Sequence, residues 1–319
     1  MSQISFQNQV VIVTGAGGAL GRTYALDIAR RGGAVVVNDL GGTVEGHDSS
    51  RDTADRVVAE IRAAGGRAIA SYDSVETTDG AQRIVATTLG AFGRVDALIN
   101  NAGNFRSCPF DEARGEDLDA LLSAHLVGTF NATHAVWAHM KAQRYGRIVF
   151  TTSAAGMLGH ANLSAYGSAK GGITGLMNVL SQEGAPHGIL CNALMPNAMS
   201  RMGQSFAKSG VAKEPKDNPH LAAILPTMDP VYNAGITVYL ASDACTSTHS
   251  IYSSLGGRVA RVFVGVTQGW QGPREVPASA EDIAMNIEQI RDVAHGFDIP
   301  DNLSDEYRIV ATGIAKRSR

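Results

Sequence analysis

The sequence predicts an α/β protein built on a doubly wound parallel sheet, and three observations carry this prediction. Short runs rich in Val, Ile and Ala alternate with longer helical stretches along most of the chain. The short runs are continuously apolar, as expected for strands that are covered on both faces. The first run ends in a glycine-rich turn that leads directly into a helix. Strand, helix and strand repeated in this order indicate parallel strands with helices on both sides of the sheet.

Six strands and at least three helices are expected from this alternation. The expected strands span residues 10–14, 34–39, 67–72, 97–100, 147–152 and 190–195. The clearest helices span residues 20–31, 52–64 and 117–141. We expect one domain over residues 1–264, and a C-terminal extension, residues 265–319, that packs on the same domain and contains a helix at 280–294. Two segments depart from the alternation, because residues 41–50 form a long polar loop and residues 199–226 form a candidate lid.

The composition is globular and argues against several classes of protein. With 319 residues, 44% hydrophobic and 18% charged, the chain can bury a full core. The net charge of −3 gives no support for nucleic-acid binding. No apolar run is long enough to span a bilayer, and the N-terminus lacks the pattern of a signal peptide, so we expect a cytoplasmic protein without membrane association. Cys108, Cys191 and Cys245 are widely spaced, which predicts reduced thiols rather than disulfides or a metal site.

A glycine-rich turn follows the first expected strand and suits a bound pyrophosphate. Residues 14–21 read TGAGGALG, and a helix follows at once. Glycines let the backbone approach a phosphate closely, and the helix N-terminus offers free N–H groups to the anion. On its own such a turn can be merely a tight connection, but the strand before it and the helix after it favour a dinucleotide site. The expected cofactor contacts are Gly15, Gly18, Leu20 and Gly21.

Asp39 ends the second expected strand and predicts the choice of cofactor. A carboxylate at this position can accept hydrogen bonds from both ribose hydroxyls of NAD. The same charge repels the 2′-phosphate of NADP, and no Arg or Lys stands directly beside it in the sequence. We therefore expect NAD as the cofactor; the alternative for Asp39 is a helix or turn cap.

Further cofactor contacts are expected after the third and fourth strands. Asn101, Ala102 and Gly103 follow the fourth strand, at the edge where ligands bind in such sheets. Asn is also common in loops that need left-handed backbone geometry, so a simple turn is the alternative. Asp73 follows the third strand and either faces the adenine or is a solvated loop acid.

Tyr166 and Lys170 are the expected catalytic centre. Their spacing of four residues places both side chains on one face of a predicted helix. Hydride transfer to a ketone creates an alkoxide that needs a proton, and a free tyrosine is a poor acid or base at neutral pH. A lysine ammonium one turn away is expected to favour the phenolate and to lower the pKa of Tyr166. Ser153, at the end of a buried strand, can hold the substrate oxygen by a hydrogen bond.

Taken together, these motifs resemble the short-chain dehydrogenase/reductase family. Thr-Gly-x5-Gly, Asn-Asn-Ala-Gly, a Ser thirteen residues before a Tyr, and Tyr-x-x-x-Lys occur in the family's order across most of the chain. The resemblance implies hydride transfer at nicotinamide C4, with Tyr166 as acid or base and Ser153 orienting the substrate. It implies that Lys170 binds the nicotinamide ribose and that Tyr166 and Pro196 also lie at the cofactor. A homodimer or homotetramer is usual in the family.

A narrower resemblance concerns the substrate. Residues 37–42 (VNDLGG), 145–148 (YGRI) and 196–202 (PNAMSRM) are similar to the (3R)-hydroxyacyl-CoA dehydrogenase group, found in peroxisomal multifunctional enzyme type 2 and in bacterial relatives. This implies oxidation of a 3-hydroxyacyl-CoA to the 3-oxoacyl-CoA. His125 stands where many family members carry an asparagine that holds a proton-relay water. A ring nitrogen can serve the same purpose, and packing within the helix is an equal alternative.

Two other functions remain open at this stage. One is a dehydrogenase of a free steroid, terpene or other secondary alcohol, and the other is a non-catalytic nucleotide-binding scaffold. Basic side chains in the candidate lid bear on the choice, because they can attract the phosphates of an acyl-CoA. Ordinary solvated charges are the alternative for these residues, which are Arg201, Lys208, Lys213 and Lys216.

Overall fold

The computed structural model describes residues 3–200, 219–273 and 275–317. It divides into two compact units, Met1–Arg261 and Val262–Arg319. The division lies three residues before the predicted one at residue 264, and the expected packing of the extension on the same domain stays a prediction. The four basic residues of the candidate lid, Arg201, Lys208, Lys213 and Lys216, lie outside the described residues.

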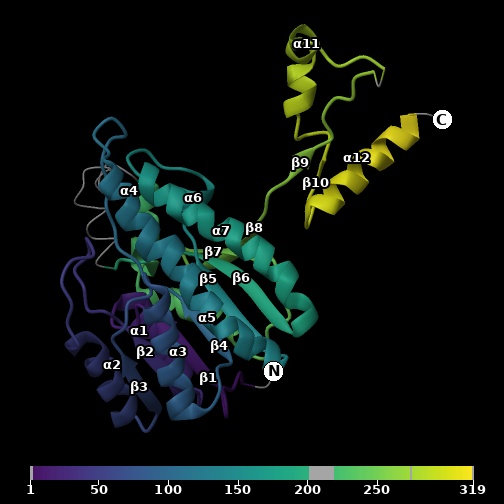
Figure 1. Ribbon diagram of the computed structural model, residues 1–319. Helices are drawn as coiled ribbons and strands as arrows, with labels where there is room; N and C mark the ends of the chain where they lie inside the picture. Colours follow the sequence, from purple (N-terminus) through teal and green to yellow (C-terminus); the bar gives the residue numbers. More distant parts are fainter. Residues whose placement is uncertain (1–2, 201–218, 274, 318–319) are drawn as a thin grey trace. The chain divides into compact units, whose positions relative to one another are not determined.

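The first unit is built around an eight-stranded sheet in the order β3-β2-β1-β4-β5-β6-β7-β8 (Figure 1). Its strands are β1 (Val10–Thr14), β2 (Ala34–Asn38), β3 (Arg67–Ser71), β4 (Ala97–Asn100), β5 (Gly146–Thr151), β6 (Ile189–Pro196), β7 (Ser250–Leu255) and β8 (Arg258–Val262). The neighbours from β3 to β7 pair in parallel. The winding reverses between β1 and β4, and ligands bind at the carboxyl ends of the strands at such a point.

Helices cover both faces of this sheet, as the doubly wound prediction requires. In Figure 1, α5 and α7 run in front of the strands labelled β4 to β7. The helices are α1 (Ala19–Arg30), α2 (Asp52–Ala63), α3 (Thr78–Phe92), α4 (Gly115–Leu121), α5 (Gly128–Gln143), α6 (Ala154–Met157), α7 (Ser164–Gly184), α9 (Pro219–Ile224) and α10 (Ala234–Ala241). Helices α3, α5 and α7 are neighbours in one layer, and α1 contacts α2 and α10 in the other.

The six predicted strands are confirmed to within one residue at each end. Every residue of β1, β2, β4 and β5 is buried, which is why their sequences are apolar without alternation. The predicted polar loop at 41–50 contains no helix or strand. The strands β7 and β8 were not predicted. A turn at Gly256 and Gly257, with φ of 66° and 75°, joins them, and such values suit glycine.

The prediction of a single regular helix over residues 117–141 is wrong. The segment is instead α4, then a π-helix, η1 (Leu122–Val127), and then α5. A single π-helical turn inserts an extra residue into a helix and thereby changes which side chains face inward. Such turns are frequent at functional sites. His125 lies in this turn and is buried.

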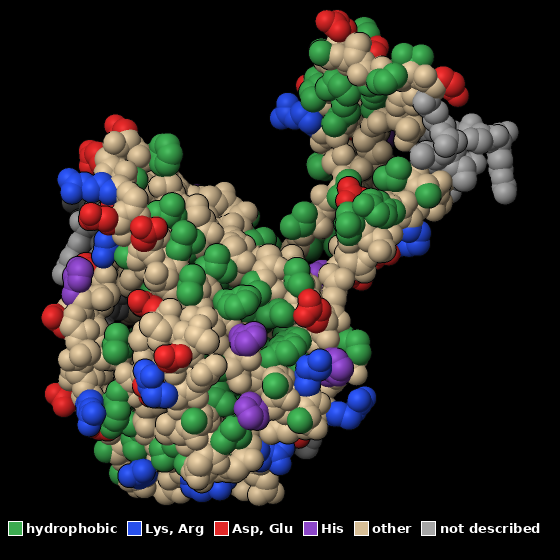
Figure 2. Space-filling model, in the orientation of Figure 1, with side chains coloured by type: hydrophobic (Ala, Val, Ile, Leu, Met, Phe, Trp, Pro, Cys, Tyr) green, Lys and Arg blue, Asp and Glu red, His purple; other side chains and the backbone are tan. Residues whose placement is uncertain are grey.

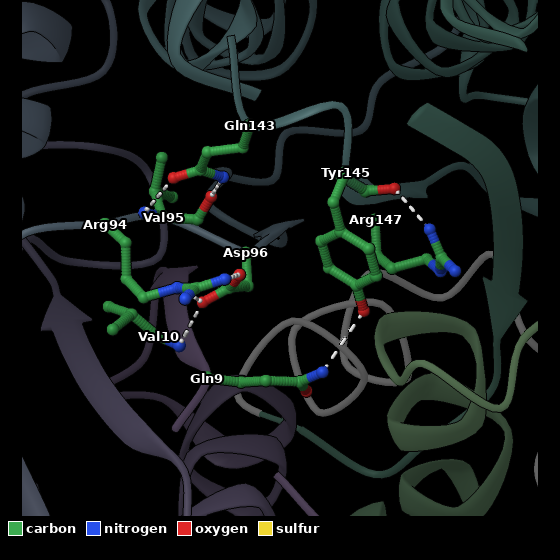
Figure 3. A network of polar contacts seen from close by, with 9 residues as sticks. Gln9, Val10, Arg94, Val95, Asp96, Gln143, Tyr145 and Arg147 are labelled. Atoms are coloured by element: carbon green, nitrogen blue, oxygen red, sulfur yellow. Dashed lines mark hydrogen bonds and ion pairs between the residues drawn. The ribbon is translucent and has the colours of Figure 1, made fainter. Parts of the chain in front are cut away.

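Polar contacts tie the strands together at the amino edge of the sheet, which is the edge opposite to the carboxyl ends (Figure 3). Asp96 is 1% exposed, accepts the Val10 N–H at 2.8 Å and pairs with Arg94 at 2.6 Å. The Gln9 amide donates to the Tyr145 hydroxyl at 3.2 Å. These contacts stabilise the fold away from the candidate site.

The second unit contains β9 (Val266–Thr267), β10 (Phe297–Asp298), α11 (Ala280–Arg291) and α12 (Leu303–Arg317). The two strands pair antiparallel. The predicted helix at 280–294 is confirmed as α11, which begins with a capping box between Ser279 and Asp282. None of the described side chains in this unit is buried, so the described part of the unit contains no apolar core.

Candidate active site

The glycine-rich turn between β1 and α1 is shaped by close backbone contacts. Gly15 has a φ of 64°, and a Cβ added there would lie 2.8 Å from the Ala102 Cα. A Cβ added at Gly21 would lie 2.4 Å from the Gly15 carbonyl oxygen. Side chains at these two positions would therefore displace the backbone. The turn thus brings bare backbone to the N-terminus of α1, where an anion is favoured.

Thr14 and Asn101 hold this turn against the loop after β4. The Asn101 side-chain amide donates to the carbonyl oxygens of Thr14 at 3.0 Å and Gly15 at 3.1 Å. The Thr14 hydroxyl accepts the N–H groups of Asn101 at 3.0 Å and Ala102 at 3.1 Å. Sequence reasoning missed this role of Thr14, although its place directly before Gly15 is visible. The side chain of Asn101 therefore shapes the turn through protein contacts.

A cleft opens beside this turn, at the carboxyl ends of β1, β2 and β4. Nine of the predicted cofactor residues line it: Gly15, Gly18, Leu20, Gly21, Asp39, Asp73, Asn101, Ala102 and Gly103. Tyr166, Lys170 and Pro196 are not among its lining residues. Pro196 ends β6 and is half-buried beside its pairing partner Ser254.

The loop at 41–50 also lines the cleft, which the sequence did not reveal. Thr43, Val44 and Gly46 contribute to the wall. The Val44 carbonyl oxygen accepts the Phe105 N–H at 2.8 Å, so the loop is fastened to the segment after β4. The two loops thus form adjoining walls of one site.

The Asp39 carboxylate lies in the cleft and holds two backbone groups. One oxygen accepts the Gly17 N–H at 2.7 Å, and the other accepts the Gly41 N–H at 2.7 Å. Asp39 therefore ties the glycine-rich turn to the start of the polar loop. Asp73 also lines the cleft, and its carboxylate accepts a hydrogen bond from the Arg83 guanidinium at 2.6 Å. Asp73 therefore lies in the cleft beside an exposed guanidinium, and its expected contact with the adenine stays a prediction.

Ser153, Tyr166 and Lys170 come together at the end of β5 and the start of α7. Lys170 is 3% exposed, and its Nζ donates to the Thr151 carbonyl oxygen at 2.7 Å. The same Nζ lies 5.8 Å from the centroid of the Tyr166 ring. Ser153 caps α6, and its side chain acts to lower the pKa of the Tyr166 phenol. The structure thus gathers the three predicted catalytic groups.

The expected lowering of the Tyr166 pKa is wrong for the protein without bound cofactor. Burial raises the pKa of Tyr166 to about 12, and the effect of the Ser153 side chain offsets this only in part. Burial also lowers the pKa of Lys170 to about 7. Desolvation therefore outweighs the effect expected from the spacing of Tyr166 and Lys170 along the helix.

His125 and Phe105 enclose the Tyr166 ring. The His125 ring meets it edge-on, with ring centroids 5.3 Å apart. The Phe105 ring meets it edge-on at 5.4 Å. Sequence reasoning missed Phe105, because nothing in the local pattern distinguishes it from an ordinary loop residue. The phenol therefore sits in an aromatic surrounding that accounts for its desolvation.

Other kinds of site find no support in the described part of the chain. No cluster of three or more His, Cys, Asp or Glu side chains suits a metal ion there. Within the same ranges, no helix has the length and apolar character needed to cross a membrane.

Comparison with known proteins agrees with this geometry. A family model described as short chain dehydrogenase matches residues 9–208. A short-chain type dehydrogenase/reductase of Mycobacterium tuberculosis is 41% identical over 288 residues, which is 90% of this chain and 96% of that protein. The peroxisomal multifunctional enzyme type 2 of Mus musculus is 40% identical over 295 residues, which is 92% of this chain and 38% of the mouse enzyme. This chain thus spans well under half the length of the mouse enzyme.

A solved structure extends the comparison to the fold. The short chain dehydrogenase of Mycobacterium paratuberculosis, bound to NAD, superposes with a TM-score of 0.70 and 26% identity over 78% of this chain and 97% of that one. The family match covers more than half of this chain, and the Mycobacterium tuberculosis relative is matched over almost its whole length. The chain therefore belongs to the short-chain dehydrogenase/reductase family of oxidoreductases.

Proposed function

We propose that the protein is an NAD-dependent dehydrogenase that interconverts a secondary alcohol and a ketone. The substrate we propose is a (3R)-3-hydroxyacyl-CoA, oxidised to the 3-oxoacyl-CoA in fatty-acid or steroid side-chain breakdown. The observation that carries the reaction type is the buried group of Ser153, Tyr166 and Lys170. It lies near a cleft whose glycine-rich turn and Asp39 suit a dinucleotide.

Each of the three side chains has a role that its surroundings allow. When bound, the cofactor supplies the hydride acceptor and a positive charge. Ser153 holds the substrate oxygen and steadies the charge that develops there. Tyr166 takes the hydroxyl proton in alcohol oxidation and returns it in ketone reduction. Lys170 lies beside the Tyr166 ring, where it can favour the phenolate and bind ribose hydroxyls.

Asp39 supports NAD rather than NADP. Its carboxylate lies in the cleft, where the adenosine ribose is expected, and like charges placed together cost several kcal/mol. This corresponds to a preference of about 100-fold or more in affinity. The NAD-bound relative from Mycobacterium paratuberculosis has the same fold and is consistent with this assignment.

Replacing Asp39 with Ser and Leu40 with Arg should move the preference toward NADP. Leu40 lines the cleft beside Asp39 and is 39% exposed, so an arginine there can meet a 2′-phosphate. The ratio of kcat/KM for NAD to that for NADP should fall by about 100-fold. The double variant should also unfold at a lower temperature, because Gly17 and Gly41 lose their shared acceptor.

Leu40→Arg alone is the matched control and should keep the preference for NAD, since the carboxylate remains. A wild-type enzyme that prefers NADP would contradict the assignment of Asp39.

The substrate is tested by comparing thioesters with free alcohols. A steady-state screen with NAD would include 3-hydroxyacyl-CoAs of several chain lengths, both stereoisomers, and free steroid and terpene alcohols. We expect the (3R)-3-hydroxyacyl-CoAs to have the highest kcat/KM. A higher value for a free alcohol would favour that class as the substrate, and no NADH formation with any alcohol would favour a non-catalytic role.

The exposed apolar side chains of α5 and α7 support the expected homodimer or homotetramer. Phe130 is 52% exposed and stacks on His134, with ring centroids 6.0 Å apart. Val127, the last residue of η1 directly before α5, and Val179 on α7 are also exposed, at 42% and 54%. Figure 2 shows hydrophobic and histidine side chains interspersed on this face. Several large apolar side chains exposed on one face are typical of subunit contacts.

Phe130→Asp should shift the protein to a smaller species in light scattering coupled to size-exclusion chromatography. A buried, unpaired carboxylate in such a contact costs several kcal/mol. Phe110→Asp, a change at a loop residue that is 81% exposed, is the control and should leave the assembly intact. An unchanged oligomer in Phe130→Asp would remove this face from the proposal.

A further inference from the structure

The polar loop of residues 41–50, which we call the strap, is closed at its base. The Ser50 N–H donates to the Leu40 carbonyl oxygen at 3.0 Å and joins the two ends of the loop. Gly41 has a φ of 77°, and a Cβ added there would lie 1.9 Å from the Ser50 carbonyl oxygen. The Asp39 carboxylate also accepts the Gly41 N–H at 2.7 Å. The strap is therefore a compact loop with adjoining ends, and such loops are frequently functional.

The tip of the strap is bound to the segment after a different strand. The Val44 carbonyl oxygen accepts the Phe105 N–H at 2.8 Å, and Phe105 follows β4. In the sheet, β1 lies between β2 and β4. Neighbouring strands are about 4.8 Å apart, so the strap reaches about 10 Å across the sheet from the end of β2. On this course it passes the carboxyl end of β1, where the glycine-rich turn begins.

The buried side chain of Asn104 packs against the tip of the strap. Gly46 has a φ of 90°, and a Cβ added there would lie 2.8 Å from the Asn104 Nδ2. Asn104 is 5% exposed, and its Nδ2 donates to the Ala120 carbonyl oxygen on α4 at 3.1 Å. The asparagine is therefore fixed by α4, and the bare backbone at Gly46 lets the strap approach it closely.

Arg106 links the tip of the strap to the same helix. Its Nη1 pairs with the Asp117 carboxylate on α4 at 3.0 Å, and its Nη2 makes a longer contact of 3.5 Å with the Glu45 carbonyl oxygen. The Asp117 carboxylate also accepts the Arg114 N–H at 3.2 Å at the start of α4. Asp117 thus holds the guanidinium in place, with its positive charge against a backbone carbonyl of the strap. Charged donors make stronger hydrogen bonds than neutral donors.

We infer that the strap is a gate over the dinucleotide site and that Asn104 and Arg106 are positioning residues that hold it closed. The inference rests on the proposed function, because it takes the cleft to bind NAD. The strap lines the same cleft as Gly15 and Gly18 of the glycine-rich turn, so a pyrophosphate on that turn lies beside the strap. A bound cofactor leaves, and a new one enters, only when the tip of the strap detaches from the segment after β4. Opening of such a segment limits turnover in many enzymes.

A reversible crosslink tests whether the strap must open. A Cβ added at Gly46 would lie 3.4 Å from the Asn104 Cβ, close to the separation of about 3.5–4.5 Å found in disulfides. The test protein carries Gly46→Cys and Asn104→Cys together with Cys108→Ser, which removes the competing half-buried thiol. Stopped-flow fluorescence should show that NADH binds and dissociates at least about 10-fold more slowly in the oxidised protein than in the reduced one.

The reduced form of the same protein is the matched control. A cysteine at position 46 must adopt the unfavourable φ in both redox states, so the cost of this strain cancels in the comparison. Cys108→Ser alone, treated with the same oxidant, should bind and release NADH at unchanged rates. Equal rates in the oxidised and reduced forms, with the disulfide verified by mass spectrometry, would overturn the inference.

Arg106→Ala tests the fastening without a crosslink and covers the case in which the disulfide does not form. Loss of the guanidinium frees the tip, so NADH should dissociate about 3- to 10-fold faster than from the wild type. The control is Arg62→Ala, because Arg62 also donates to a backbone carbonyl, that of Ala68, at 3.0 Å near the amino end of β3. Arg62→Ala should lower the melting temperature to a similar extent but leave the dissociation rate unchanged.

An equal acceleration in Arg106→Ala and Arg62→Ala, or none in Arg106→Ala, would overturn the inference. The outcomes separate it from the proposed function. NADH that binds to the wild type and exchanges equally fast in all variants would exclude the gate and leave the dehydrogenase standing. A wild-type protein that binds no NADH would exclude both.

Discussion

Replacing Tyr166 with Phe is expected to lower kcat for alcohol oxidation by about 10³- to 10⁴-fold, at the upper end of what one acid–base group contributes. In the proposed mechanism the phenol oxygen takes the substrate proton, and Phe has no group that can replace it. Phe keeps the ring that packs against Phe105 and His125, so the melting temperature should change little. Steady-state kinetics with a 3-hydroxyacyl-CoA gives the rate.

NADH binding should survive in Tyr166→Phe, with a Kd within about five-fold of the wild type in a calorimetric titration. The matched control is Tyr145→Phe. It removes a phenol hydroxyl that accepts a hydrogen bond from Gln9 at the amino edge of the sheet, far along the strands from the site. Its kcat should be close to that of the wild type. Near-normal rates in Tyr166→Phe would exclude the proposed mechanism.

The strands were predictable because their burial is uniform. A run such as residues 34–38 is apolar on both faces, and the glycines and polar residues at its ends mark its limits. The strand β7, with the sequence SIYSSL, gives no such signal. It forms because its backbone pairs with β6, with Asn192 opposite Ser250, which is a tertiary effect. Local pattern therefore finds the centre of the sheet and misses its far edge.

Some features of the candidate site could likewise be predicted from local sequence, and others could not. Gly15 and Gly21 were predictable because a close backbone approach leaves glycine as the only residue that fits. The π-helix η1 could not be predicted, because the helical periodicity of residues 117–141 continues through it. The sign of the Tyr166 pKa shift was missed because spacing along a helix reveals a neighbouring lysine but not the depth of burial. Desolvation depends on Phe105 and His125, which come from other elements.

Lys170→Met is expected to remove activity and, in the absence of cofactor, to make the protein more stable. In the proposed mechanism Lys170 binds the ribose and favours the phenolate of Tyr166, so its loss should lower kcat/KM by about 10³-fold. The stability gain has a separate cause. Burial lowers the pKa of Lys170 from 10.5 to about 7. An unfolded chain pays no such desolvation cost, so the buried lysine opposes folding wherever the unfolded lysine is charged.

The size of this cost follows from the shift in pKa. Each unit corresponds to about 1.4 kcal/mol, so the full shift amounts to roughly 5 kcal/mol as an order of magnitude. Methionine avoids the cost but leaves the Thr151 carbonyl oxygen without the donor that lies 2.7 Å away, which costs about 1–3 kcal/mol. A net gain of about 2–4 kcal/mol in the free energy of unfolding is therefore expected at pH 7.

The stability gain of Lys170→Met should decrease as the pH rises. The unfolded lysine binds a proton between about pH 7 and 10.5 that the folded lysine does not, so raising the pH favours the folded wild type. The cost of burying Lys170 is complete at and below about pH 7 and disappears above about pH 10.5. Urea unfolding of the cofactor-free proteins should therefore show an advantage for Lys170→Met that shrinks from pH 7 to pH 10. Lys141→Met, at an exposed position on α5, should show no such trend. An advantage of equal size at both pH values, or none at pH 7, would contradict the lowered pKa of Lys170 in the folded protein.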